Sequence, residues 1–449
     1  MYTKLNRIAE IAKENPNMQF TSLMHLIDKE MLLNCHKELK PKKAAGIDEV
    51  TKAEYENNLD RNIENLLERM KTLKYKPKPV RRTYIPKVGS NKKRPLGIPS
   101  YEDKIVQLAI NKVISSIYEQ DFLDSSFGFR ANRSAHDAIK ILDVYLSRRN
   151  INFVVDADIK GFFDNVDHKW MMKFLQHRIK DKNLLRYIGR FLNAGVLEDG
   201  KFYKAYNGTP QGGLVSPTLG NIYLHYVLDL WFEKVVRKWC KGEAYIVRYA
   251  DDFVCCFQYE SDAQAFYRTL KKRLAKFNLE IAEDKTKIVY FGKKAYFDRK
   301  FGRIQKNHQP KTFDFLGFTH YCSCRQNGSF RVKRKTSSKK FRASLKKVKD
   351  WIRLNMHTSI EILMKNLNRK LLGYFRYYGV TDNSISLNKF RDCVQRILYK
   401  ILNRRSQVKS LNWDKYTLFK RIHKTQNYKI YVNIFELRKE ISYIMQMVI

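Results

Sequence analysis

The sequence predicts an α+β fold, because helical and strand-like patterns occupy different parts of the chain. Apolar residues recur three and four positions apart in residues 20–35 and 63–73, and residues 330–449 have a similar helical pattern. Between these parts lie short segments rich in β-branched and aromatic residues, as is typical of strands. A chain of 449 residues is long enough for two or three domains.

One strand-like segment, residues 245–257, is interrupted by two adjacent carboxylates, Asp251 and Asp252. We interpret it as two strands joined by a tight turn that carries the acidic pair. Neighbouring carboxylates repel each other, and a divalent cation beside them relieves that repulsion. The alternative is a solvated turn, in which Asp is common because it forms local hydrogen bonds.

A second acidic segment, residues 152–167, also resembles a buried strand that runs into a turn. Side chains alternate between the two faces of a strand, so Asp156 and Asp158 share one face. If this strand lies beside the first hairpin, Asp158 and Asp251 come together. Two such carboxylates can hold a pair of Mg²⁺ ions about 4 Å apart for phosphoryl transfer.

The charge of the chain indicates a polyanionic partner. Lys and Arg number 87 against 45 Asp and Glu, giving a formal net charge of +42 and a pI near 9.9. Nucleic acid is the expected partner of so basic a protein. A membrane is not expected, because no apolar run approaches the roughly 20 residues of a spanning helix and no signal-like start is visible. Together with seven scattered cysteines, these features predict an intracellular, cytoplasmic protein.

Three loops carry candidate nucleic-acid contacts. Arg94 lies just before a proline and a glycine, where a guanidinium can clamp a triphosphate in bidentate fashion. Arg130 and Arg133 alternate with aromatic residues, a pattern that suits contacts with bases and phosphates. Gln211 is bracketed by glycines and prolines, so its backbone is bare enough for close approach of a base pair. A solvated charge run, a packed aromatic core and a plain turn are the respective alternatives.

Six segments, in order along the chain, resemble the successive motifs of reverse transcriptases of the group II intron-encoded (maturase) lineage. They are Lys93-Arg-Pro-Leu-Gly-Ile-Pro99, Phe127-Gly-Phe-Arg-Ala-Asn-Arg-Ser134, Asp158-Ile-Lys-Gly-Phe-Phe-Asp164, Thr209-Pro-Gln-Gly-Gly-Leu-Val-Ser-Pro217, Tyr249-Ala-Asp-Asp252 and Phe315-Leu-Gly-Phe318. The fifth motif alone is moderately specific, whereas six in the order of the family are strongly specific.

The resemblance implies a right-hand polymerase. Its expected parts are an N-terminal helical extension with a template-clamping loop (residues 1–75), fingers (76–150), a palm with an antiparallel sheet and packed helices (151–325), and a helical thumb or domain X (326–449). Some relatives also carry a cysteine-rich nuclease domain. We find no such pattern and expect no cleavage of the second DNA strand.

The resemblance also implies a role for individual residues. The expected metal ligands, for two Mg²⁺ ions with Mn²⁺ as a possible substitute, are Asp158, Asp251, the backbone of Ile159 and, in an assisting role, Asp252. Arg94, with Lys92 or Lys93, is expected to contact the triphosphate of the nucleotide. Phe163, or its rival Phe162, is expected to be the aromatic gate that excludes a 2′-hydroxyl. Gln211 and Gly212 are expected at the nascent base pair, and Lys285 near the primer end. Lys339, Lys340, Arg404 and Arg405 fit a groove that follows phosphates, although a charged helical bundle needs no ligand.

The predicted function is RNA-directed DNA polymerisation from a primer 3′-hydroxyl, with RNA template, DNA primer and product, and dNTPs as partners. By the resemblance, the chain also binds intron RNA and assists splicing, in association with ribonucleoprotein or nucleoid. A stand-alone relative with a host task such as antiphage defence would share every catalytic motif. A non-catalytic RNA-binding protein is a third candidate, disfavoured because paired aspartates without metal carry only an electrostatic cost. These motifs do not fix the oligomeric state.

Overall fold

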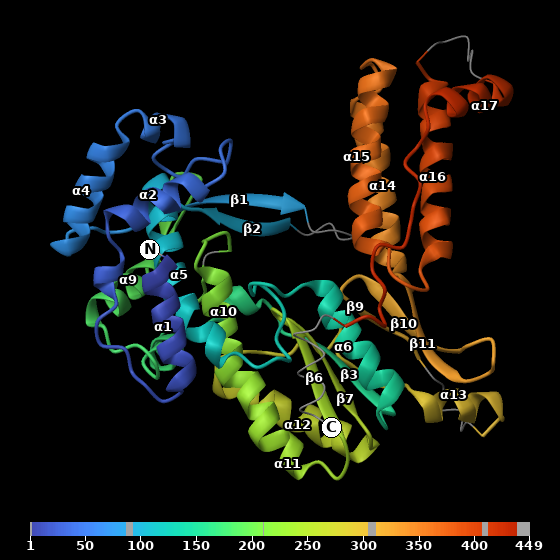
Figure 1. Ribbon diagram of the computed structural model, residues 1–449, viewed down its shortest axis with the longest axis horizontal. Coiled ribbons are helices and arrows are strands. Elements are labelled where there is room, and N and C mark those ends of the chain that lie inside the picture. Colours follow the sequence, from blue (N-terminus) through green and yellow to red (C-terminus); the bar gives the residue numbers. More distant parts are fainter. Residues whose placement is uncertain (1, 87–92, 210, 304–310, 406–411, 438–449) are drawn as a thin grey trace.

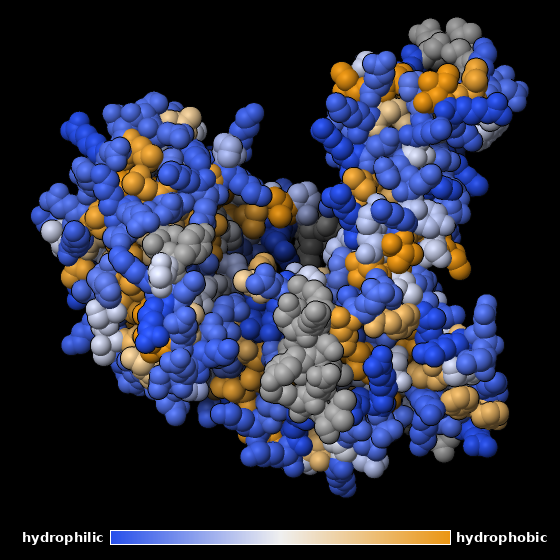
Figure 2. Space-filling model, viewed as in Figure 1, coloured by the Kyte–Doolittle hydropathy of each residue, from blue (hydrophilic) through white to orange (hydrophobic). Residues whose placement is uncertain are grey.

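The computed structural model describes residues 2–86, 93–209, 211–303, 311–405 and 412–437. Two lobes rise from a shared base that contains the central sheet (Figure 1). One lobe is built from N-terminal helices, and the other from helices near the C-terminal end. Figure 2 shows the molecular surface hollowed between the lobes, with largely hydrophilic walls.

The N-terminal lobe is organised around one long buried helix, α5 (Tyr101–Asp121). The helices α1 (Tyr2–Glu14) and α2 (Lys29–Glu38) pack directly against it. The remaining helices of this lobe are α3 (Lys52–Glu56), α4 (Leu59–Lys71), α8 (His168–Leu175) and α9 (Lys182–Leu192). Ser100 caps α5 by accepting a hydrogen bond from the Asp103 amide, which fixes where the helix begins.

A small sheet of order β2-β1-β4-β5 extends from this lobe toward the opposite one (Figure 1). Its strands are β1 (Val80–Pro86), β2 (Lys93–Ile98), β4 (Val196–Glu198) and β5 (Lys201–Tyr203). The strands β1 and β2 pair antiparallel, so Arg94 lies opposite Ile85 on the exposed part of the hairpin.

The central sheet has the order β6-β7-β3-β8, and every neighbouring pair is antiparallel. Its strands are β3 (Phe153–Asp158), β6 (Ala244–Tyr249), β7 (Asp252–Phe257) and β8 (Lys287–Tyr290). Successive side chains of each strand point to opposite faces of the sheet and so enter two different cores. Val155 and Cys255 belong to one apolar cluster, and Val154 and Cys256 belong to another. The predicted α+β fold, with an antiparallel sheet and packed helices, is therefore confirmed.

Helices cover both faces of this sheet. The helix α12 (Glu260–Lys276) packs on β3 and β7, whereas α6 (Ala135–Arg148) packs on β6. The other helices of the base are α7 (Phe162–Asn165), α10 (Ser216–Leu224), α11 (Arg237–Trp239) and α13 (Lys293–Lys300). Between α10 and α11 the helix widens into two π-helical segments, η2 (His225–Asp229) and η3 (Phe232–Val236).

A third sheet, of order β11-β10-β9, joins the base to the C-terminal lobe. Its strands are β9 (Phe313–Phe315), β10 (Phe318–Cys324) and β11 (Phe330–Thr336). The prediction of helical structure from residue 330 is wrong over β11. The predicted domain boundary at residue 326 falls in the turn between β10 and β11, and the four domain ranges remain predictions.

The C-terminal lobe consists of α14 (Ser338–Leu354), α15 (Ile360–Tyr378), α16 (Ser384–Leu402) and α17 (Trp413–Ile422). It has an apolar core of its own, in which Tyr374 stacks on Phe390 with ring centroids 3.7 Å apart. Buried Arg334 connects this lobe to the base. Its guanidinium donates to Asp143 of α6 and lies 4.0 Å from Asp382, which is in the connection between α15 and α16. No helix within the described ranges is both long and apolar enough to span a membrane.

Candidate active site

The turn between β6 and β7 and the first residue of β7 present two acidic side chains, Asp251 and Asp252, at one end of the central sheet. Tyr249 pairs with Asp252, so Ala250 and Asp251 form the turn itself. Ala250 has φ of +57°, a left-handed conformation that residues with a Cβ atom rarely adopt. The predicted hairpin with a tight acidic turn is present.

The strand that carries Asp158 lies directly beside this hairpin. Asp158 pairs with Asp252 across β3 and β7, and alternation along β3 puts Asp156 on the same face. Burial raises the pKa of Asp251, and the charge of Asp158 raises it further. The expected proximity of Asp158 and Asp251 is therefore met.

This acidic cluster is poorly solvated. Burial raises the pKa of Asp252 to about 7, and the charges of Asp156, Asp251 and Asp158 contribute in the same direction. Burial also raises the pKa of Asp156 to about 6, against the opposing charge of Lys287. Holding every carboxylate ionised at neutral pH requires additional positive charge at this place.

Carboxylate oxygens are the ligands that hard divalent cations prefer, so the donor set fits such an ion. Over the described ranges, no three His, Cys, Asp or Glu side chains are already grouped to hold a metal ion. Instead, the Lys285 ammonium lies 2.5 Å from Oδ2 of Asp158 and supplies positive charge. Ile159, which follows Asp158, forms an isolated bridge with Ile281 and buries its side chain.

The β1–β2 hairpin brings basic residues toward the same edge. Lys93 and Arg94 are exposed on β2, and the positive charge of Arg94 acts on Asp251. Lys92 lies outside the described residues. The Gly97 amide donates to the Gln211 carbonyl at 2.7 Å, which ties the hairpin to the loop that begins α10.

Comparisons with known proteins agree with this geometry. Residues 85–320 match the family model of reverse transcriptases (RNA-dependent DNA polymerases), and residues 341–419 match the maturase-specific domain of group II introns. The group II intron-encoded protein LtrA of Lactococcus lactis subsp. cremoris is 30% identical over 455 residues, covering 86% of this chain and 75% of the relative. Protein YkfC of Escherichia coli is 34% identical over 281 residues, covering 55% and 73%. A putative COX1/OXI3 intron 1 protein of Saccharomyces cerevisiae is 31% identical over 232 residues, covering 51% and 27%.

The chain belongs to the group II intron type of reverse transcriptase and maturase. The reverse transcriptase match includes all three aspartates, and the enzyme is an RNA-directed DNA polymerase. Reverse transcriptases use divalent metal ions, and their partners are RNA and DNA.

The two candidate gate residues of this reverse transcriptase have different environments. Phe162 is buried in the core beside Tyr223, so its ring is not accessible to a nucleotide. Phe163 is only partly buried and packs edge-on against Phe162. The structure therefore rules out Phe162 as the accessible ring and leaves Phe163 as the candidate.

The loop at Gln211 is tightly constrained. Gly212 has φ of +121°, and a Cβ atom there would lie 2.5 Å from the Gly97 carbonyl oxygen. Gln211 is partly buried, and its side-chain amide donates to both carboxylate oxygens of Asp164 at 3.3 Å. The space beside the bare backbone predicted for this loop is thus filled in part by strand β2.

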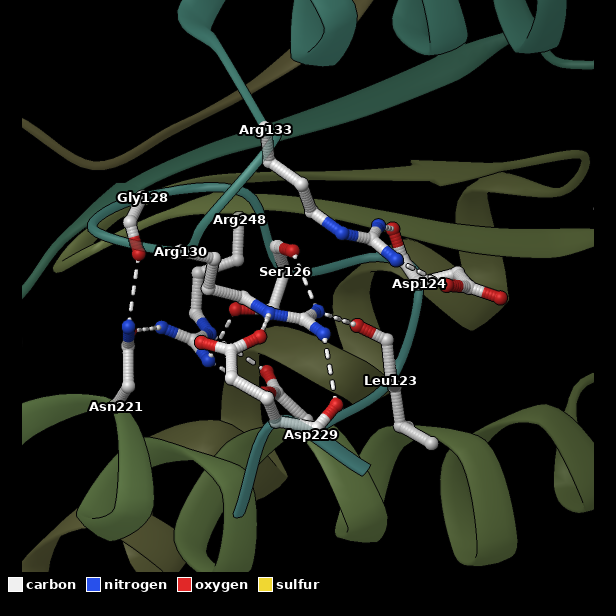
Figure 3. Close-up of polar contacts among 10 residues, drawn as sticks. Leu123, Asp124, Ser126, Gly128, Arg130, Arg133, Asn221, Asp229 and Arg248 are labelled. Carbon is white, nitrogen blue, oxygen red and sulfur yellow. Dashed lines mark hydrogen bonds and ion pairs between the residues drawn. The ribbon is translucent and has the colours of Figure 1, made fainter. Parts of the chain in front are cut away.

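Arg130 does not have the role that its sequence context suggested. It is 7% exposed, and its guanidinium donates to the Glu119 carboxylate and to the carbonyls of Leu123 and Ser126 (Figure 3). A buried guanidinium with these partners is not available to nucleic acid, so that prediction is wrong. Arg133 bonds Asp124 and lies over the ring of Phe127, which also gives it a structural role.

Four polar residues beside the active site were missed by the sequence analysis. They are Ser126, Asn221, Asp229 and Arg248, and all four are buried. Arg248 forms a buried ion pair with Asp229 (Figure 3). The sequence offered one indication of this cluster: Arg248 is the single charged residue in the apolar strand that leads to the acidic turn.

The basic residues of the C-terminal lobe differ in accessibility. Lys339 and Lys340 are exposed at the start of α14, and the charge of Lys340 acts on Asp252. Arg404 is exposed after α16. Arg405 instead donates to the carbonyls of Met356 and Thr358, where it stabilises the connection between α14 and α15.

Proposed function

We propose that Asp158 and Asp251, with the Ile159 carbonyl and with Asp252 assisting, hold two Mg²⁺ ions during extension of a primer on an RNA template. Mn²⁺ is the expected substitute, because it accepts the same oxygen ligands. When bound, such ions stabilise the attacking and leaving oxygens of phosphoryl transfer. The observation that carries this proposal is the concentration of carboxylates at one sheet edge, where the pKa of Asp252 is raised to about 7.

The surrounding residues suit the binding of a nucleotide. Arg94, helped by Lys93 or Lys92, would hold the triphosphate of the incoming dNTP, and the action of its charge on Asp251 supports this role. Gln211 and Gly212 would support the nascent base pair from a loop held by β2. Phe163 would press on the sugar and exclude a 2′-hydroxyl. Lys285 would leave Asp158 and move toward the primer end when the metal ions bind.

The two lobes would hold the nucleic acid between them. Residues 76–150 and 326–449 are the proposed fingers and thumb, residues 151–325 the palm, and residues 1–75 a template-clamping extension. Lys339, Lys340 and Arg404 are exposed cations that suit duplex phosphates. The maturase match over residues 341–419 supports a further role for the thumb in binding the cognate intron RNA and assisting its splicing.

Substitution of one catalytic carboxylate tests the polymerase site. We expect Asp251→Asn to lower dNTP incorporation on an RNA template by about 10³-fold or more, because metal-bound charge at the reacting phosphate is lost. Binding of a primer–template duplex, measured by fluorescence anisotropy, should match that of the wild type. Asp60→Asn, on the remote helix α4, is the control and should retain full activity. Incorporation at the wild-type rate by Asp251→Asn would refute the assignment.

A second experiment separates the maturase role from a host task. Purified protein is added to the intron RNA that flanks its gene, and the splicing rate is measured. We expect acceleration by both the wild type and Asp251→Asn, since splicing needs no DNA synthesis. Acceleration by neither, or absence of a flanking intron, would favour the stand-alone host role.

A further inference from the structure

Arg248 is completely buried three residues before Asp251. Its guanidinium has five N–H groups, and each one has an acceptor. Nε and Nη2 donate to the two carboxylate oxygens of Asp229 at 2.7 and 2.5 Å, and Nη2 also donates to Oγ of Ser126 at 2.7 Å. Nη1 donates to Oδ1 of Asn221 at 3.0 Å and to the Ala250 carbonyl at 2.9 Å. Figure 3 shows these side chains converging from separate segments.

The same network also contacts the backbone of the acidic turn, through Asn221 and Gly128. The Asn221 amide donates to the Gly128 carbonyl at 2.8 Å, and a Cβ atom on Gly128 would lie 2.3 Å from the Ala250 nitrogen. Arg248 and the segment from Ser125 to Phe127 also exchange two backbone hydrogen bonds of 2.8 Å. Ala250, which has the left-handed conformation, is thus held by the hydrogen bond from Arg248 to its carbonyl and by the backbone at Gly128, which lies against its nitrogen.

The placement of Asp229 depends on an irregular helix. It is the last residue of the π-helical segment η2, whose wider turn changes the direction of side chains relative to the preceding α10. π-helical turns are rare and frequently occur at functional sites. Here the turn lets Asn221 of α10 and Asp229 of η2 both reach Arg248.

We propose that Arg248, Asp229 and Asn221 are positioning residues that hold Ala250 in its left-handed conformation and thereby fix the carboxylate of Asp251. This inference rests on the proposed role of Asp251 in metal binding. A buried ion pair is not required for stability, because apolar residues of similar size often replace one without loss. A strained backbone residue, by contrast, persists only where its surroundings determine its conformation.

The test replaces the ion pair without leaving a buried charge. The double variant Arg248→Met with Asp229→Leu fills the same space with apolar side chains but cannot hold the Ala250 carbonyl. Asn221→Ala is the second variant, and it leaves the ion pair in place. The control is Arg178→Met with Asp121→Leu, because Arg178 is also buried, ion-paired and bonded to backbone carbonyls, but joins the α8–α9 connection to α5 and the N-terminal segment.

For each variant we would measure the thermal midpoint, kcat, KM for dNTP and affinity for a primer–template duplex. In both test variants kcat should fall about 10²-fold, as expected for misplaced catalytic groups, with KM and duplex affinity unchanged. The control should lose stability and retain kcat. A folded double variant with wild-type kcat would overturn the inference, and if that variant does not fold, wild-type kcat in Asn221→Ala would overturn it. Asp251→Asn is assayed in parallel, so that failure of the metal-site assignment is recognised separately.

Discussion

The ammonium nitrogen of Lys285 lies 2.5 Å from Oδ2 of Asp158, at the end of strand β3. Asp158 raises the pKa of Lys285, so the two groups form a mutually stabilising pair. In the proposed metal site, an ion bound to Asp158 would have to compete with this ammonium.

Removal of that internal cation should strengthen metal binding. We expect Lys285→Ala to bind Mn²⁺ several-fold more tightly than the wild type in the absence of nucleic acid, as measured by electron paramagnetic resonance of free Mn²⁺. The control is Lys160→Ala, because Lys160 pairs with Glu280 at 3.1 Å instead of an active-site aspartate. Equal Mn²⁺ affinity in Lys285→Ala and the wild type would contradict the competition.

The raised pKa of Asp252, about 7 against an ordinary value of 3.8, makes the metal-free protein sensitive to pH. Because the folded state favours the protonated carboxyl, this contribution to stability is complete below about pH 4 and is lost as the pH rises through 7. In EDTA, Asp252→Asn should therefore melt above the wild type at pH 8, by about 2 °C or more. The difference should shrink toward pH 5, and scanning calorimetry across this range would check it. A difference that does not change with pH would show that Asp252 is not the cause.

The backbone at Gly128 lies directly against the acidic turn, and Gly128→Ala tests that contact. The new Cβ atom would lie 2.3 Å from the Ala250 nitrogen, so the turn has to move. We expect kcat to fall about 10²-fold, with an accompanying loss of thermal stability. Gly189→Ala is the matched control, since a Cβ atom in that helix meets nothing within 4 Å. It should stabilise α9 by about 0.5–1 kcal/mol without changing kcat.

His320 is fully buried, stacks on Phe313, and has no hydrogen-bond partner for either ring nitrogen among the described residues. Burial, with a contribution from Arg334, lowers its pKa to about 3. The unfolded chain binds a proton near pH 6.5, so stability falls as the pH decreases from about 6.5 toward 3, by at most about 1.4 kcal/mol per pH unit.

His320→Phe should remove much of this dependence and keep the stacked ring. We expect the thermal midpoint of the variant to drop less than that of the wild type between pH 7.5 and 5.5. The exposed residue His357 supplies the control, because His357→Phe should follow the wild-type curve. Parallel curves for His320→Phe and the wild type would refute the prediction.

The central sheet and its acidic edge could be predicted because alternation constrains both. In residues 153–158 and 252–257, buried positions alternate between two cores, and a one-residue slip in register would move every side chain into the opposite core. Only one arrangement keeps Asp158 beside the acidic turn. The motif order then identified the family.

Other parts could not be predicted, because they depend on contacts that only the folded chain brings together. Arg130 lies in a loop of aromatic and basic residues, and its inward orientation becomes visible only when Glu119 of α5 and two loop carbonyls are seen to accept its hydrogen bonds. Strand β11 was missed because one of its inward positions is Arg334, whose partner Asp143 lies 191 residues away. A charged residue in an apolar face hides the period of a strand.

The C-terminal lobe is attached through Arg334 at one end, so a small rotation there would move the opposite end by a larger distance. Helix α15 has 19 residues and is therefore about 28 Å long, whereas the charged contacts described for Arg334 lie at one end of the lobe. A swing of about 10° at this pivot would displace the far tip by about 5 Å. In the proposed thumb, such a swing would change the width of the space between the lobes at the tip and leave the acidic cluster in place.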